Sequence, residues 1–349
     1  DWSSDVCSSD LAGRRAEVCN TCWRVEDAGG ASYRHRAADM LLEPDLAAPA
    51  GAAPRIQFVD LRLGNFCNLK CRMCIPYSSR LLIPEYKELQ EGDEDFWEDM
   101  ANIAWFDSDV FWQDLLAYAG DFRRVHLAGG EPMVIARAWA FLRKLKELGL
   151  SKNIELSYNT NWTVIPKWTA EVWSGFKAVD LFISMDGVGP VNELIRRPLK
   201  WDEFRRNLDV VEERHAEFNI RHASIHATAQ VYNVMRLPEL CAYVRGFEFI
   251  DPYPHIETVV HPEVFDPRVL PADLKQKARG HILDYAALLT SDRARLLRQD
   301  LSAVTEHMMA ADHSHLLPQL RRYNEVFDRH RSERAVDVLP ELETVLGGG

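Results

Sequence analysis

Short strand-like runs and longer helical patterns alternate through the middle of the chain. Apolar and polar residues alternate over 57–63, and strand-like runs recur at 124–128, 154–158, 179–185, 223–231 and about 255–260. Apolar residues at helical spacing fill the intervals at about 135–148, 166–176, 202–217 and 237–245. This alternation predicts an α/β fold with parallel strands and right-handed crossovers. Six strands are too few for a closed eight-stranded barrel, so we expect a partial, open (β/α)6 TIM-like barrel.

The segments that flank this pattern suggest the domain boundaries. Residues 12–50 form a short cysteine-bearing segment that runs into an Ala/Pro-rich linker, and 51–262 would be the barrel core. Residues 263–349 are helical by pattern and predict a C-terminal extension. An acidic, aromatic insertion at 91–121 is either a cover over a substrate or a helical pair packed on the barrel.

The first eleven residues, DWSSDVCSSDL, need a separate interpretation. A back-translation of this string resembles a common sequencing adapter. We therefore expect residues 1–11 to be non-native read-through, Cys7 included, and the natural chain to continue upstream. The alternative is a polar, Ser-rich terminus.

Composition narrows the classes of function. With 41 basic and 53 acidic residues the formal charge is -12, which disfavours binding to nucleic-acid phosphates. No apolar run approaches the roughly 20 residues that span a bilayer, and no secretory signal is evident, so we expect a cytoplasmic protein without membrane contact. The seven cysteines are clustered, which indicates metal ligands or redox groups and not a disulfide framework.

Three cysteines follow the first predicted strand as Cys67-x3-Cys71-x2-Cys74. Three thiolates in a tight loop can each bind one iron of a [4Fe–4S] cluster, which leaves the fourth iron open. A zinc site or three buried structural cysteines are the alternatives. Zinc usually takes four ligands, often in paired CxxC form.

Polar groups also follow the next four predicted strands. They are Gly129, Gly130 and Glu131 after the second strand, Asn159 and Asn161 after the third, Ser184 and Asp186 after the fourth, and Gln230 with Asn233 after the fifth. Ligands gather at the carboxyl ends of parallel strands, so we expect these groups to converge. Turn chemistry and helix capping would explain several of them equally well. His255, Glu257 and His261 could bind a metal, although surface histidines are commoner.

These motifs resemble the radical S-adenosylmethionine (SAM) superfamily. The segments LRLGNFCNLKCRMC, LAGGEP, LSYNTN and FISMDGVGPVNELIR carry the resemblance, which extends from Leu61 to about Leu270 and is nearest to the SPASM/twitch group, in particular to twitch-domain-containing proteins. The resemblance implies that Cys67, Cys71 and Cys74 hold a [4Fe–4S] cluster. The open iron would bind SAM, whose reductive cleavage gives a 5′-deoxyadenosyl radical that abstracts hydrogen from a substrate.

The resemblance also implies roles for the groups after the strands. Glu131, with Gly129 and Gly130, would bind the SAM amino group. Ribose, adenine and carboxylate contacts would come from Asn159, Asn161, Ser184, Asp186, Gln230 and one of two consecutive arginines, of which we favour Arg197. Met73 stands where an aromatic residue is frequent, and its polarizable side chain can still pack beside an adenine.

Cys19 and Cys22 resemble the end of an auxiliary-cluster segment, so residues 12–50 would be its remnant. In the full-length protein these two cysteines would then bind an auxiliary [4Fe–4S] cluster together with ligands from upstream. A redox or zinc CxxC pair is the alternative. Cys241 lies in an apolar helical pattern and is expected in the core.

The resemblance implies a peptide or protein substrate and an external flavodoxin- or ferredoxin-like electron donor. Two further hypotheses stay open. One is a non-catalytic iron–sulfur or zinc-binding module, which would need no SAM site. The other is a radical SAM enzyme that acts on RNA or on a small molecule.

Overall fold

The computed structural model describes residue 15, residues 19–27 and residues 55–347. The chain divides into two units, Asp1–Phe58 and Val59–Gly349. The first unit contains helix α2 (Asn20–Asp27), and Arg15 forms an ion pair of 2.7 Å with Asp27. The predictions for residues 1–11 and for the linker lie outside the described residues.

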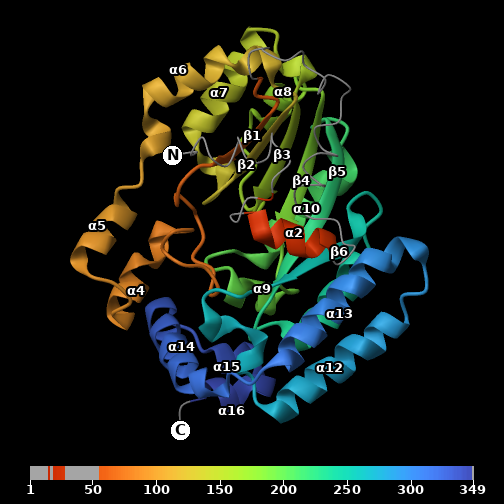
Figure 1. Cartoon of the computed structure of the whole chain (residues 1–349). Coiled ribbons are helices and arrows are strands. Elements are labelled where there is room, and N and C mark those ends of the chain that lie inside the picture. The colour runs from red at the N-terminus through yellow and green to blue at the C-terminus, as the bar shows by residue number, and fades with distance from the viewer. Residues whose placement is uncertain (1–14, 16–18, 28–54, 348–349) are drawn as a thin grey trace. The chain divides into compact units, whose positions relative to one another are not determined.

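A six-stranded sheet in the order β1-β2-β3-β4-β5-β6 forms the centre of the second unit (Figure 1). The strands are β1 (Phe58–Arg62), β2 (Arg124–Ala128), β3 (Glu155–Thr160), β4 (Ala178–Ser184), β5 (Ile220–Ala229) and β6 (Asp251–Thr258). Strands β2 to β6 pair in parallel, each with the next along the chain. The predicted α/β class with a parallel sheet of six strands is thus confirmed.

The fifth strand begins earlier than its pattern predicts, at Ile220 instead of residue 223. Arg221 and His222 interrupt the apolar run there, because both side chains are exposed. Arg221 instead forms an ion pair with Asp180 of β4. A pairing between two strands therefore extends β5 where the local pattern indicates none.

Helices connect the strands. They are α4 (Ile83–Leu89), α5 (Glu94–Ala101), α6 (Asp109–Ala117), α7 (Ala136–Glu147), α8 (Thr169–Trp173), α9 (Pro190–Ile195), α10 (Trp201–Arg214) and α11 (Leu237–Val244). The insertion at 91–121 contains α5 and α6 and packs on the rest of the unit. Trp112 of α6 is buried, and its ring centre lies 5.1 Å from that of Phe141 in α7. This packing favours the helical-pair interpretation of the insertion.

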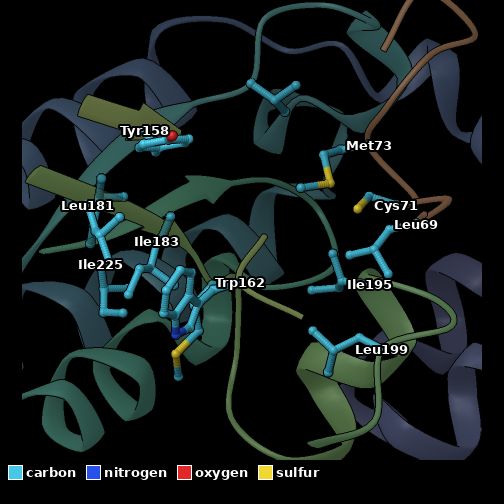
Figure 2. Close-up of a cluster of buried hydrophobic side chains, with 14 of the residues drawn as sticks. Leu69, Cys71, Met73, Tyr158, Trp162, Leu181, Ile183, Ile195, Leu199 and Ile225 are labelled. Carbon is cyan, nitrogen blue, oxygen red and sulfur yellow. The ribbon is translucent and has the colours of Figure 1, made fainter. Parts of the chain in front are cut away.

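The two faces of the sheet differ in polarity. Apolar side chains such as Leu127, Leu181 and Ile225 alternate with polar ones along the strands, and those named are fully buried. Figure 2 shows this apolar cluster continuing from the strands past Trp162 to Cys71. The loop that carries the cysteines is therefore packed on the core.

The chain beyond Pro271 is helical, as predicted. It forms α12 (Ala272–Ala287), α13 (Arg295–Ala310), α14 (Leu317–Arg331), α15 (Ala335–Val338) and α16 (Glu343–Leu346). Helix α13 packs on β6, α14 on α4, and α15 on α9 (Figure 1). These helices lie in the same compact unit as the sheet.

Candidate functional site

A cavity of about 450 Å³ opens at the carboxyl ends of the strands. This volume falls within the range of roughly 300–1,000 Å³ that is typical of small-molecule sites. Among the residues that line it are Arg62, Cys67, Cys71, Met73, Cys74, Gly129, Gly130, Asn159, Thr160, Asn161, Ser184, Arg196, Thr228 and His261. We call it the cysteine cavity. The cavity brings together the three cysteines, Met73 and five of the predicted cofactor contacts at the strand ends. These five are Gly129, Gly130, Asn159, Asn161 and Ser184.

The cysteine loop, residues 67–74, is a compact turn after β1. The Cys74 N–H donates to the Cys71 carbonyl at 3.1 Å, which draws the last two cysteines together. The Leu69 N–H donates to Cys67 Sγ at 3.4 Å. Arg196 Nη1 lies 4.0 Å from Cys71 Sγ, so a positive charge faces the thiols.

Neighbouring groups shift the pKa values of the three thiols in different directions. A hydrogen bond from Cys74 lowers the pKa of Cys71, and the charge of Arg196 adds to this effect. The same bond, together with burial, raises the pKa of Cys74. Burial, helped by the nearby Cys71, raises the pKa of Cys67 to about 12. The nearby charge of Arg196 favours the thiolate form at Cys71, the form that binds metal.

The positions of the possible metal ligands can be compared with what different metal groups require. Among residue 15, residues 19–27 and residues 55–347, no three His, Cys, Asp or Glu side chains are placed to hold one metal ion. A [4Fe–4S] cluster makes a different demand, because each thiolate binds its own iron and the three sulfurs need not converge on one point.

The two glycines after β2 permit close contact between that strand and the cysteine loop. Both have positive φ, +77° for Gly129 and +53° for Gly130. A Cβ at Gly130 would lie 2.3 Å from the Phe66 carbonyl oxygen, and one at Gly129 would lie 2.8 Å from the Arg62 backbone. A side chain at Gly129 would push the end of β1 away from β2, and one at Gly130 would displace Phe66, the residue directly before the cysteine loop.

Glu131 is buried and already bonded within the protein. Its carboxylate accepts hydrogen bonds from the N–H groups of Met133 (3.0 Å) and Asn161 (2.6 Å) and from Thr160 Oγ1 (2.8 Å). Glu131 itself does not line the cysteine cavity. The contacts show that it ties the end of β2 to the end of β3.

Burial raises the pKa of Glu131 from an ordinary value of 4.5 to about 7. The protonated form is then favoured in the folded state, so its stabilising contribution is complete below pH 4.5 and is lost as the pH rises through about 7. As the pH rises across this window, the unfolding free energy of the cluster-free wild-type protein should fall relative to that of Glu131→Gln. The expected fall is roughly 1.4 kcal/mol for each unit of pKa shift. Denaturant unfolding at several pH values measures the difference.

Glu341→Gln is a control for this prediction. Pairing with Arg236 lowers the pKa of Glu341 against the opposing effect of burial, so its contribution is lost only as the pH falls below the ordinary range. A wild-type minus Glu131→Gln difference that stays constant between pH 4.5 and pH 8 would contradict the assignment for Glu131.

Of the two consecutive arginines, Arg196 and not Arg197 lines the cysteine cavity. Arg196 Nη2 forms an ion pair of 2.8 Å with Asp186, and both side chains are buried. Arg197 points the other way and forms an ion pair with Glu333. The placement differs from the choice of Arg197 made on sequence, because the chain turns directly after α9 and takes the two adjacent side chains to different partners, Asp186 and Glu333.

The remaining predicted contacts are distributed around this pair. Asn159, Asn161 and Ser184 line the cysteine cavity, whereas Asp186 and Gln230 lie behind its wall. Gln230 is fully buried, and neither side-chain amide atom has a hydrogen-bond partner among the described residues. The Asn233 amide donates to the carbonyls of Asp186 and Thr228, both at 2.9 Å, and so fixes the loop that follows β5.

Several cavity residues were not singled out on sequence as contacts, and among them Arg62, Thr160 and Thr228 are polar residues of the strands. Each is at or next to the carboxyl end of a strand, which is the one signal that could have identified them. Among the late histidines, His261 lines the cavity, whereas His255 bonds to Asp300 at 2.9 Å.

The other described cysteines do not line the cysteine cavity. Cys241 is buried in α11, as expected for a core residue. Cys22 belongs to α2, Cys19 directly precedes it, and both are free and partly buried. The upstream ligands that would complete an auxiliary site are outside the described residues. No helix in the described ranges is long and apolar enough to cross a membrane.

One family model is similar to part of the chain. The family model of the radical SAM superfamily matches residues 61–222. That range contains the three cysteines, Glu131, Asp186 and Arg196. No curated protein is significantly similar to the chain in sequence.

Solved structures give weaker likenesses. Streptococcus suis SuiB bound to S-adenosylmethionine is 16% identical over 68% of this chain and 49% of its own, with a TM-score of 0.39. The anSMEcpe structure with AdoMet and the Cp18Cys peptide is 17% identical over 67% of this chain and 60% of its own, with a TM-score of 0.41. TYW1 with a lysine–pyruvate adduct is 13% identical over 68% of this chain and 74% of its own, at 0.34. The chain thus spans about half to three fifths of the length of the first two, and scores this low support no functional argument.

Proposed function

We propose that the chain binds a [4Fe–4S] cluster and SAM in the cysteine cavity and cleaves SAM reductively, as expected of an enzyme of the radical SAM superfamily, whose family model matches residues 61–222. The observation that carries the proposal is the convergence of the Cys67, Cys71 and Cys74 thiols with Arg196 in one cavity at the strand ends. We propose a partial barrel as the form of the sheet.

The residues of the cavity fit both groups. Three thiols can supply three iron ligands and leave the fourth iron for SAM. Arg196 has a buried Nε without a hydrogen-bond partner in the described structure, although the residue lines the cavity. A carboxylate, such as that of SAM, would provide the missing acceptor.

The side chains around the cavity bind and orient. Cys67, Cys71 and Cys74 hold the cluster, and Asp186 fixes the guanidinium of Arg196. Asn159 and Ser184 offer hydrogen-bond groups suited to ribose hydroxyls, and Met73 offers an apolar surface suited to adenine. When bound, the cluster supplies the electron that breaks a C–S bond of SAM to give a 5′-deoxyadenosyl radical.

For Glu131 we propose a role that differs from the one the resemblance implies. Since its oxygens already accept three protein hydrogen bonds, we propose that it positions the strand ends and leaves the SAM amino group to neighbouring backbone and side-chain acceptors. Gly129 and Gly130 line the cavity beside it and allow that approach.

We propose hydrogen abstraction from a peptide or protein substrate, with a flavodoxin- or ferredoxin-like electron donor and, in the full-length protein, an auxiliary [4Fe–4S] cluster at Cys19 and Cys22. Support for these finer points is the sequence resemblance to the SPASM/twitch group. The charge of -12 speaks against an RNA substrate. A cytoplasmic location remains a prediction from sequence.

Anaerobic reconstitution with iron, sulfide and a low-potential reductant tests the core of the proposal. We expect equal amounts of 5′-deoxyadenosine and methionine from SAM, measured by chromatography, and no formation of either without the reductant. Cluster-loaded protein that leaves SAM intact would refute catalysis and favour the alternative of a non-catalytic iron–sulfur module.

A further inference from the structure

The cysteine loop pairs with the segment that carries Arg196. The Lys70 N–H donates to the Arg197 carbonyl at 2.6 Å, and the Arg72 N–H donates to the Ile195 carbonyl at 2.8 Å. These two bonds join the cysteine loop to the last residue of α9 and the turn that follows it, residues 195–197. Since Arg196 extends toward the cavity from one of them and Cys71 belongs to the other, their pairing determines how far apart these two groups lie.

The side chains of Arg72 and Arg197 point away from the cysteine cavity, and both donate to the carboxylate of Glu333. Glu333 Oε1 accepts from Arg72 Nη2 at 2.8 Å, and Glu333 Oε2 accepts from Arg197 Nε. The Arg72 side chain is fully buried and that of Glu333 is 7% exposed. The Glu333 carboxylate therefore joins the cysteine loop to residues 195–197, although it lies more than 100 residues away from either segment in the sequence.

We infer that Glu333 is a positioning residue for the proposed cluster and SAM site. Its carboxylate holds the cysteine loop against residues 195–197 and thereby fixes Cys71 relative to Arg196. The roles of Cys71 and Arg196 rest on the proposed function. Glu333 lies outside the residues that match the family, so the match assigns it nothing.

Other acidic groups near Arg72 do not make the same bridge. Asp328 also forms an ion pair with Arg72, but its other hydrogen-bond partners among the described residues are Asn324 and the Ala335 N–H, both in the C-terminal helices. Asp328 therefore anchors Arg72 to α14. Glu333 alone among the described carboxylates has hydrogen bonds to both Arg72 and Arg197.

The alternative is that Glu333 only attaches the C-terminal helices to the rest of the unit. Glu341→Gln gives a matched control for that role. Glu341 is also C-terminal and largely buried, and its carboxylate accepts from Arg236, which follows β5 and lies outside the cysteine cavity. Both substitutions remove one carboxylate charge, but only Glu333→Gln affects the pairing of the cysteine loop.

The test compares Glu333→Gln, Glu341→Gln and the wild-type chain by two measurements. The first is amide hydrogen exchange of 67–74 and 195–197 in the cluster-free protein, which reports local opening. The second is the dissociation constant for SAM after reconstitution. We expect Glu333→Gln to speed exchange in both segments and to weaken SAM binding roughly 10–100-fold, as changes to groups behind metal ligands do. Glu341→Gln should match the wild type in both.

The inference would be overturned if Glu333→Gln had the same exchange rates and the same SAM dissociation constant as the wild type. A fall in melting temperature like that of Glu341→Gln would then indicate a purely structural role. Should Glu333→Gln not fold, Arg197→Gln removes one arm of the bridge and should speed exchange in the same two segments; unchanged exchange there would overturn it equally. If the wild type binds no SAM, the proposed function fails, whereas the exchange comparison still decides the positioning role.

Discussion

Cys71→Ala is expected to abolish both cluster binding and SAM cleavage. Cys71 is the buried member of the three cysteines, and its environment favours the thiolate through the hydrogen bond from Cys74 and the charge of Arg196. Loss of one of three protein ligands leaves the cluster with two, which is too few to retain it. Iron and sulfide per chain after reconstitution should fall toward zero, and 5′-deoxyadenosine should fall to the level seen without the reductant.

Cys241→Ala is the control for this loss. Cys241 is likewise fully buried but lies in α11, away from the cysteine cavity. This variant should bind the same amount of iron as the wild type and cleave SAM at a similar rate. A Cys71→Ala protein that keeps its iron and its cleavage rate would refute the assignment of the loop as the cluster site.

Asp186→Asn should destabilise the fold by about 3–5 kcal/mol, the typical cost of leaving one member of a buried ion pair without its partner. The Asp186 and Arg196 side chains are 0% and 8% exposed and lie 2.8 Å apart. Asp186 also accepts a hydrogen bond of 2.8 Å from the Thr228 N–H, and because the amide oxygen of asparagine can still accept it, the substitution acts mainly on the ion pair. Chemical denaturation measures the change in unfolding free energy.

The double variant Asp186→Asn with Arg196→Met separates stability from binding. Removing the unpaired charge should restore most of the lost unfolding free energy, because apolar replacements of buried ion pairs are often neutral or better. SAM binding should stay as weak as in Arg196→Met alone, since the guanidinium that faces the cavity is missing. Recovery of SAM affinity together with stability would show that Arg196 has only a structural role.

Several features of the site were readable from short stretches of sequence. The spacing of Cys67, Cys71 and Cys74 within eight residues suffices to place three thiols on one loop, whatever surrounds it. The strand-like runs at 124–128 and 154–158 correspond closely to β2 and β3 because their apolar residues alternate without interruption. Polar residues after each strand converge since parallel strands bring their carboxyl ends to one edge.

Other features depend on contacts between distant segments. The hydrogen bonds that pair residues 70–72 with 195–197 decide that Arg196 and not Arg197 turns toward the thiols. The Glu131 carboxylate points toward Thr160 and Asn161 at the end of the next strand, β3. Its oxygens therefore already accept hydrogen bonds from the protein. Neither fact has a local signature.

By itself, then, the sequence determined the thiol motif, the α/β alternation and the set of polar residues at the strand ends, because these follow from spacing and periodicity over a few residues. Only the tertiary structure decided which arginine enters the cavity, what holds Glu131, and that Glu333 joins two segments of the site from the far end of the chain. The physical reason is that side-chain direction and buried charge pairing depend on which backbone segments lie side by side, and pairings over more than 100 residues leave no pattern in either segment alone.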